Sequence, residues 1–263
     1  MELGLKGKVA VVAASSKGLG KAVARGLARE GANLTIFSRD RKSIEETGRE
    51  ISVETGAEVL ALSADVTKRD DIERVASLTI EKYGAVHVLV NNAGGPPFGY
   101  SDDFGYEDWK AALELNLLST INLTRAVVQT MKTQQWGRIV NITSIAVKEP
   151  IDGLILSNAS RAGVIGFAKT ISRELAPYNV MVNNVCPGRI MTSRIEHLAD
   201  ERAKVMGVSK EEVYREWEAD IPAGRLGKPS ELADLVVFLS SERSSYLTGA
   251  TIQVDGGAIR SLF

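Results

Sequence analysis

Short apolar runs alternate with longer amphipathic stretches along the whole of this chain. Within the runs, apolar and polar positions do not alternate as they do in a strand that has one face in water. Strands without that alternation are buried on both faces, as in a parallel sheet with helices on either side. Seven runs predict strands, over residues 8–14, 32–37, 58–64, 86–94, 137–144, 179–188 and 251–257. The resulting β-α-β-α order predicts an α/β protein with a doubly wound sheet of about seven parallel strands.

The stretches between the runs have the period of amphipathic helices. In residues 20–31 apolar side chains recur on one face, and Gly31 fits the position just after a helix end. Residues 70–84 repeat this pattern and end on Gly84. We therefore expect helices here that cover the sheet.

Two longer segments interrupt the rhythm, at residues 94–109 and 189–225. Both follow the carboxyl ends of predicted strands, where open α/β sheets bind ligands. We expect them to be substrate loops, although extra packing or an oligomer contact is an alternative for residues 189–225. No linker divides residues 1–263, so we expect one domain that carries this insertion.

Charge and cysteine content narrow the possible functions. The 32 basic and 33 acidic side chains leave a net charge of −1, which argues against a nucleic-acid-binding or membrane-binding face. The single cysteine, Cys186, cannot form an intrachain disulfide, and we expect it to be a small buried side chain. No signal peptide, apolar membrane span or clustered metal ligands are evident, so we expect a cytoplasmic protein without a metal.

A glycine-rich turn follows the first predicted strand and opens directly into a helix. In AASSKGLG (13–20), backbone N–H groups and the helix N-terminus can approach a pyrophosphate, with Gly18 and Gly20 allowing the tight turn and the close helix contact. The candidate cofactor-binding residues of this turn are Ser15, Ser16, Lys17, Gly18, Leu19 and Gly20. Together with the strand order, this turn predicts a Rossmann-type dinucleotide site.

The residues at the end of the second predicted strand indicate which dinucleotide the site would bind. An acidic residue there would bind the ribose hydroxyls of NAD, but the chain has Ser38 followed by Arg39. A guanidinium beside a small hydroxyl suits a 2′-phosphate, and Lys17 can add a second positive charge. We therefore expect NADP(H) in preference to NAD(H); the alternative is that both are ordinary surface cations.

These motifs together resemble the short-chain dehydrogenase/reductase family, close to its β-ketoacyl-ACP-reductase-like branch, over residues 5–257. The resemblance rests on NNAG (91–94), SADVT (63–67), ELNLLS (114–119), VNITS (140–144), PGRIMT (187–192) and YLTGATIQVDGG (246–257). It implies a hydride transfer between nicotinamide and a carbonyl or alcohol substrate of small size, and a homo-oligomer, either a tetramer or a dimer. It assigns Ser144 to polarising the carbonyl and Asn116 to a structural and proton-relay role. It further implies cofactor contacts at Asp65, Val66, Asn92, Ala93, Gly94, Pro187, Gly188, Ile190 and Thr192.

The chain departs from the family pattern at two places. The glycine motif normally begins Thr-Gly, and here Ala13 and Ala14 occupy those positions. The family also places Tyr-x-x-x-Lys thirteen residues after the serine, where this chain has Ser157 and Arg161. The flanking sequence stays in register, so these are substitutions.

The second departure alters the expected proton relay. A serine hydroxyl is far less acidic than a phenol, and it is shorter, so Ser157 is a poor general acid. Arg161 lies one helical turn away and can hold the ribose or steady an oxyanion, but its permanent charge supplies no proton. Losing a positioned general acid costs roughly 10²–10⁴ in rate, so a slow reductase is physically allowed. Lys148 or Glu149, just past Ser144, is a candidate replacement donor.

Two readings of function follow. The first is an NADP(H)-dependent oxidoreductase with an altered proton-relay site; the second is a catalytically silent NADP(H)-binding protein, either a redox sensor or the partner of an active paralogue. A hydrolase has less support because no Ser-His-acid set is evident, and we expect His87 and His197 to be structural or exposed.

Overall fold

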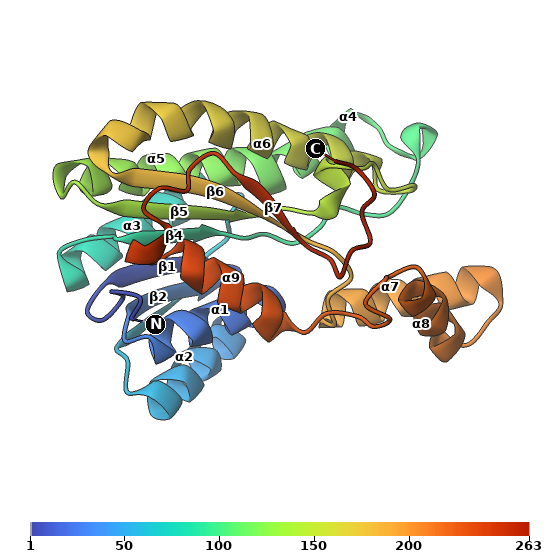
Figure 1. Ribbon diagram of the computed structural model, residues 1–263, viewed down its shortest axis with the longest axis horizontal. Helices are drawn as coiled ribbons and strands as arrows, with labels where there is room; N and C mark the ends of the chain where they lie inside the picture. Colours follow the sequence, from blue (N-terminus) through green and yellow to red (C-terminus); the bar gives the residue numbers. More distant parts are fainter. Residues whose placement is uncertain (1, 263) are drawn as a thin grey trace.

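The fold is built on one sheet of seven parallel strands, which Figure 1 shows. The computed structural model describes residues 2–262. The strands are β1 (Val9–Ala13), β2 (Asn33–Ser38), β3 (Val59–Ser63), β4 (Val88–Asn91), β5 (Gly137–Ile142), β6 (Val180–Pro187) and β7 (Thr251–Val254). Each predicted run contains a strand, although β4 and β7 end three residues before their runs do. The predicted fold class is confirmed.

The order of the strands creates a crevice at one edge of the sheet. That order is β3-β2-β1-β4-β5-β6-β7, so the chain winds outward in one direction from β1 to β3 and in the other from β4 to β7. At such a reversal the connections leave to opposite faces, which opens a crevice at the carboxyl ends of β1 and β4. The glycine turn and the NNAG segment both stand at that point.

Helices cover both faces of the sheet. One face carries α1 (Gly18–Arg29), α2 (Arg41–Thr55) and α9 (Pro229–Leu239), and the other carries α3 (Arg69–Tyr83), α5 (Ser119–Thr133) and α6 (Ile155–Leu175). Because side chains alternate along a strand, Ala10 and Val12 of β1 pack into the first core, and Val11 and Ala13 into the second. No helix within residues 2–262 is long and apolar enough to span a membrane.

The two segments that interrupt the rhythm fold into helices beyond the strand ends. The first leads through η1 (Ser101–Asp103) into α4 (Tyr106–Leu113) and a π-helical turn, η2 (Glu114–Leu118). The second forms α7 (Ser193–Met206) and α8 (Lys210–Ala219), which project from the body of the molecule in Figure 1. These two helices and Leu226, which follows them, form a separate small core with Ala199, Ala203, Val213 and Trp217. Short helical turns η3 (Ile145–Val147), η4 (Ala176–Tyr178) and η5 (Glu242–Ser244) complete the chain.

Cys186 and His87 both have structural surroundings, as expected. The Cys186 thiol is buried and lies 3.2 Å from Thr143 Oγ1, and burial raises its pKa. His87 lies one residue before β4, and its Nδ1 accepts a hydrogen bond of 3.0 Å from the backbone N–H of Val9. Burial, and then the charge of Lys8, lower the pKa of His87 to about 4. His197 is exposed on α7.

Candidate active site

The turn between β1 and α1 has little space for side chains. Gly18 has a φ of +59°, in the left-handed region that glycine adopts without strain. A Cβ at Gly20 would lie 2.5 Å from the carbonyl oxygen of Ala14, so only glycine fits there. The first turn of α1 holds no acidic residue, and Lys17 stands exposed just before it. These features fit the phosphates of a dinucleotide, which backbone N–H groups at a helix N-terminus bind well.

Ala14, which stands where the family has glycine, takes a backbone conformation that is strained for alanine. Its φ is +48°, so it takes the left-handed conformation that the family's glycine would take without penalty. A Cβ in that conformation costs roughly 1–2 kcal/mol. The turn therefore keeps its shape at the expense of local backbone strain.

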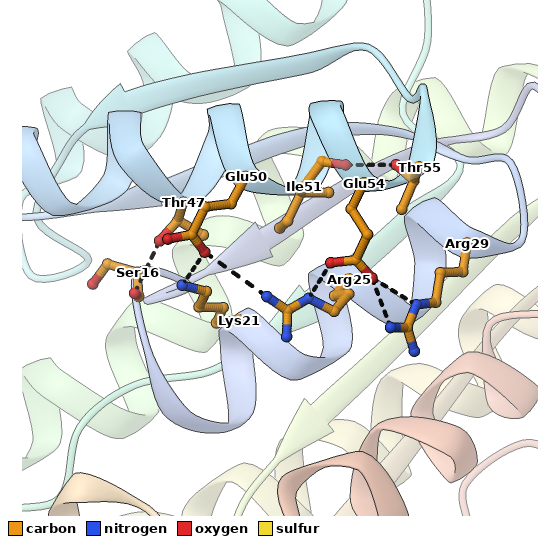
Figure 2. A network of polar contacts seen from close by, with 9 residues as sticks. All are labelled: Ser16, Lys21, Arg25, Arg29, Thr47, Glu50, Ile51, Glu54 and Thr55. Carbon is orange, nitrogen blue, oxygen red and sulfur yellow. Dashed lines mark hydrogen bonds and ion pairs between the residues drawn. The ribbon is translucent and has the colours of Figure 1, made fainter.

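Neighbouring elements hold the strained turn in place. Asn92 Nδ2, just past β4, lies 3.2 Å from the carbonyl oxygen of Ala13 and 3.3 Å from that of Ala14. From α2, Thr47 Oγ1 donates a hydrogen bond of 3.0 Å to the carbonyl oxygen of Ser16 (Figure 2). Ion pairs between α1 and α2 join Lys21 to Glu50, Arg29 to Glu54, and Arg25 to both glutamates. The helix α2, which begins just after β2, is thus fastened to the glycine turn and to α1.

The tip of β2 presents an exposed cation, and the carboxylate beside it caps the following helix. Asp40 caps α2, its Oδ1 accepting a hydrogen bond of 2.6 Å from the backbone N–H of Ser43, and hydrogen bonding from the side chain and then the backbone of Ser43 lowers the pKa of Asp40. Arg39 is exposed and has no ion pair within residues 2–262. Ser38 Oγ donates to the Asp40 carbonyl oxygen at 3.3 Å. Across the groove, Asp65 Oδ1 accepts two hydrogen bonds of 2.9 Å from Thr67.

The remaining predicted cofactor residues lie at or just after the carboxyl ends of β1, β3, β4 and β6. Thr192 caps α7, and its Cγ2 is 3.6 Å from where a Cβ on Gly18 would stand, so residues 187–192 close over the glycine turn. At Gly188 a Cβ would come within 2.7 Å of Asp255. Of the other members, Ser15, Val66 and Ile190 are buried, and Leu19, Ala93 and Pro187 are half-buried.

Asn116 sits in an irregular helical turn and fixes the loop that follows β4. It lies within the π-helical turn η2, a distortion that often marks functional positions in helices. Its Nδ2 donates a hydrogen bond of 3.0 Å to the carbonyl oxygen of Gly94, and its Oδ1 accepts one of 3.1 Å from Ser160 Oγ. Ser160 was not predicted from the sequence; only its position on the same helix face as Ser157 could have indicated it.

Arg161 joins three elements at the carboxyl edge of the sheet. Its Nε donates to Ser157 Oγ at 3.2 Å, and its Nη1 donates to the carbonyl oxygens of Ile142 and Thr143 at 3.2 and 3.1 Å. Its Nη2 donates to the carbonyl oxygen of Gly94 at 3.2 Å, the same oxygen that Asn116 holds. Four of the five N–H bonds of the guanidinium are therefore used, and one remains. Burial and, second, the charge of Arg194 lower the pKa of Arg161 to about 10, so it is charged at neutral pH.

The two serine hydroxyls at this edge keep their protons available. Ser157 Oγ accepts from Arg161, and Ser144 Oγ accepts a hydrogen bond of 3.1 Å from the backbone N–H of Ala146. Since each oxygen acts as an acceptor in these contacts, its O–H can donate to a ligand. Ser144 follows Thr143 directly, so Arg161 ties the two hydroxyls to one rigid corner.

The two candidate replacement donors differ in their surroundings. Glu149 is exposed, and its Oε2 accepts a hydrogen bond of 3.3 Å from the backbone N–H of Arg260, in the segment after β7. Lys148 is half-buried. Burial raises the pKa of Cys186, and the positive charge of Lys148 offsets part of that rise. Lys148 stays a candidate on this geometry, whereas Glu149 faces the C-terminal segment.

Comparisons with known proteins cover nearly the whole chain. The family described as enoyl-(acyl carrier protein) reductase matches residues 13–258. The 3-oxoacyl-[acyl-carrier-protein] reductase of Thermotoga maritima is 37% identical over 255 residues, which are 97% of this chain and 99% of that protein. Among solved structures, L-sorbose reductase from Gluconobacter frateurii, complexed with NADPH and L-sorbose, is 32% identical with a TM-score of 0.96, covering both chains entirely. YwfH, an NADPH-dependent reductase involved in bacilysin biosynthesis, is 31% identical with a TM-score of 0.93, over 97% of this chain and 99% of its own.

Proposed function

The chain belongs to the short-chain dehydrogenase/reductase family, and on that premise we propose that it is an NADP(H)-dependent oxidoreductase with an altered proton relay. The observation that carries this proposal is the corner around Arg161. One buried guanidinium connects the hydroxyl-bearing helix α6 to the ends of β4 and β5, beside Ser144. The guanidinium is charged at neutral pH and bonds to Ser157 while holding the strand end beside Ser144, and this charge next to two hydroxyls supports a role in the chemistry of the site.

NADP(H) is the dinucleotide that the pocket suits best. Lys17 and Arg39 are exposed cations that flank the groove, and Asp40 is occupied as a helix cap. A 2′-phosphate would meet two positive charges there, while the carboxylate of Asp40 accepts from the first turn of α2. The NADPH bound to L-sorbose reductase, a close match in fold, supports the same choice.

The residues around the reacting carbonyl would act by polarisation. When bound, the nicotinamide ring supplies or accepts the hydride. The hydroxyls of Ser144 and Ser157 would donate to the carbonyl oxygen, and the buried charge of Arg161 would stabilise the negative charge that develops there. Neither hydroxyl is acidic enough to yield its proton outright, so the final proton comes from water through Ser157. The reaction is slower than with a phenol, by roughly 10²–10⁴ in rate.

A silent coenzyme-binding protein is the second candidate. It is favoured by the bonding of Arg161, which has one N–H left for a ribose hydroxyl because four are held by protein oxygens. Arg161 therefore mainly holds the protein's own loop in place. It would bind the coenzyme less tightly than the family's lysine, whose ammonium would have all its donors free.

Titration and turnover separate the two candidates. NADPH and NADH are titrated by fluorescence, and coenzyme consumption is then followed with a panel of ketones and alcohols. Tight NADPH binding with consumption by at least one panel member supports the enzyme; tight binding with none supports the silent protein. The paired substitution Ser157→Tyr with Arg161→Lys restores the family pattern, and we expect it to raise carbonyl reduction. No gain would mean that the pocket around Gly94 has been remodelled for another use.

A further inference from the structure

Two arginine side chains converge on the loop that follows β4. Arg161 donates to the carbonyl oxygen of Gly94, and Arg194, in the first turn of α7, donates from Nη2 to the carbonyl oxygen of Pro96 at 3.0 Å. The Arg194 guanidinium lies directly over Gly95, where an added Cβ would be 3.1 Å from Nη2. Arg194 was not predicted from the sequence, although it stands only two residues after Thr192. The helix pair α7–α8 therefore touches the candidate active site through this side chain.

The positive charge at this loop is not balanced by the protein. Neither guanidinium has an ion pair with a carboxylate within residues 2–262, and Arg194 is the second cause, after burial, of the lowered pKa of Arg161. Three of the other four arginines of the same insertion are paired, Arg189 with Asp220, Arg202 with Glu216, and Arg225 with Glu231, and the fourth, Arg215, is exposed on α8. The chain as a whole carries a charge of −1, so the local excess is not an average property.

The charges on the serine side of the site have the same sign. Lys148 follows η3 and has no ion pair within the described part of the chain, and its charge acts on Cys186 near the end of β6. The adjacent carboxylate, Glu149, accepts from the Arg260 backbone. An anion entering between Ser144 and Gly95 would thus meet cations from both sides.

We propose that the substrate carries a carboxylate, and that Arg194 binds this carboxylate while the carbonyl lies at Ser144. This inference rests on the proposed function and names its substrate class: oxo acids and the corresponding hydroxy acids. Only one N–H of Arg194, on Nη2, is engaged, so the second N–H of Nη2 is left to bind a carboxylate bidentately together with that of Nη1 or of Nε. Arg161 has only one N–H left, so it cannot bind a carboxylate in this way, and it acts on the substrate only through its positive charge.

The coenzyme offers a competing explanation for Arg194. A pyrophosphate at the glycine turn is also anionic, and Thr192 packs against that turn. Arg194, however, contacts the carbonyl of Pro96, on the β4 side of the crevice. The substrate is therefore the better partner, and an experiment must score the two anions separately.

Matched acids and esters test the proposal with the full-length protein saturated with NADPH. The probes are pyruvate, acetoacetate and levulinate, each beside its methyl ester, which keeps the carbonyl and removes the charge. The three acids differ in the spacing between carbonyl and carboxylate, so together they cover a range of distances between the Ser144 hydroxyl and Arg194. Dissociation constants come from calorimetry, and turnover of the same pairs is measured in parallel. Since a charge-assisted pair is worth roughly 1.5–3 kcal/mol, we expect one acid to bind about 10- to 100-fold more tightly than its ester.

Three variants identify the group responsible. Arg194→Met is expected to bring the ratio of acid to ester affinity close to one, and Arg194→Lys to retain part of it. Arg215→Met serves as the matched control, because Arg215 is an exposed arginine on α8 whose guanidinium contacts only the backbone of its own helix. This control should keep the wild-type ratio.

The possible results separate the inference from the proposed function. Equal binding of acid and ester at all three spacings overturns the inference, whether or not the ketones are reduced. Acid-selective binding without turnover of any probe supports the anion site and counts against the redox function. If Arg194→Met weakens NADPH binding and leaves the acid-to-ester ratio unchanged, Arg194 belongs to the coenzyme phosphates and the inference is wrong.

Discussion

Replacing Arg161 by lysine tests whether its guanidinium organises the corner of the site. Lysine keeps the positive charge and has similar side-chain entropy, so the cost of burying a cation largely cancels in the comparison. What changes is the number and direction of the donors. The guanidinium makes four hydrogen bonds, to one hydroxyl and three backbone carbonyls, and an ammonium has three protons on one atom.

The expected loss follows from that count. An ammonium can keep at most three of the four contacts, and its tetrahedral donors cannot point to acceptors on three different elements at once. Within residues 2–262 only the Gly94 carbonyl has another donor, Asn116, and each buried acceptor left without one costs about 1–3 kcal/mol. Bonds that remain will be poorly directed, so we expect Arg161→Lys to lower the free energy of unfolding by about 2–3 kcal/mol. In a chain of this size, a loss of that order lowers Tm by about 4–12 °C.

Urea unfolding followed by circular dichroism measures this difference directly. The control is Arg173→Lys, an exposed arginine near the end of the same helix, for which we expect a change within about 0.5 kcal/mol. If both variants lose equally little, the four contacts of Arg161 do not hold the corner together, and the account of the site given above fails at its central residue.

Three further predictions address the turn, the coenzyme and pH. Ala14→Gly should raise the free energy of unfolding by about 0.5–1 kcal/mol, because it removes left-handed strain at some cost in chain entropy; Ala13→Gly, in the regular strand, should lower it, and denaturant titration of both variants checks the contrast. Arg39→Ala should raise the Kd for NADPH about 10- to 100-fold and hardly change that for NADH, measured by fluorescence titration; equal effects on both would remove Arg39 from the 2′-phosphate site. His87 has a folded pKa of about 4 against 6.5 for the free side chain, so the unfolded state binds more protons between these values and stability falls as pH drops through that window, by up to about 3 kcal/mol. In His87→Asn the pH dependence of Tm from pH 7 to 4 should be flatter, whereas His197→Gln should leave it as in the wild type.

Most of the fold could be predicted from the sequence because its signals are local. A strand buried on both faces must be apolar throughout, and each of the seven runs contains one. Gly84 ends α3 in the left-handed conformation, as its place after an amphipathic stretch predicted. The spacing between Ser144, Ser157 and Arg161 is also local information, since the last two lie on one helix.

The contacts of those residues depend on the tertiary structure. Three of the four acceptors of Arg161 are backbone carbonyls, and a carbonyl has no letter in the sequence that distinguishes it from any other. The same holds for the grip of Arg194 on Pro96, which lies 98 residues earlier in the chain. The sequence determined which charges and hydroxyls the chain carries. Only the packing of the folded chain decided that Arg161 uses its donors on backbone carbonyls and that Arg194 keeps donors for a ligand.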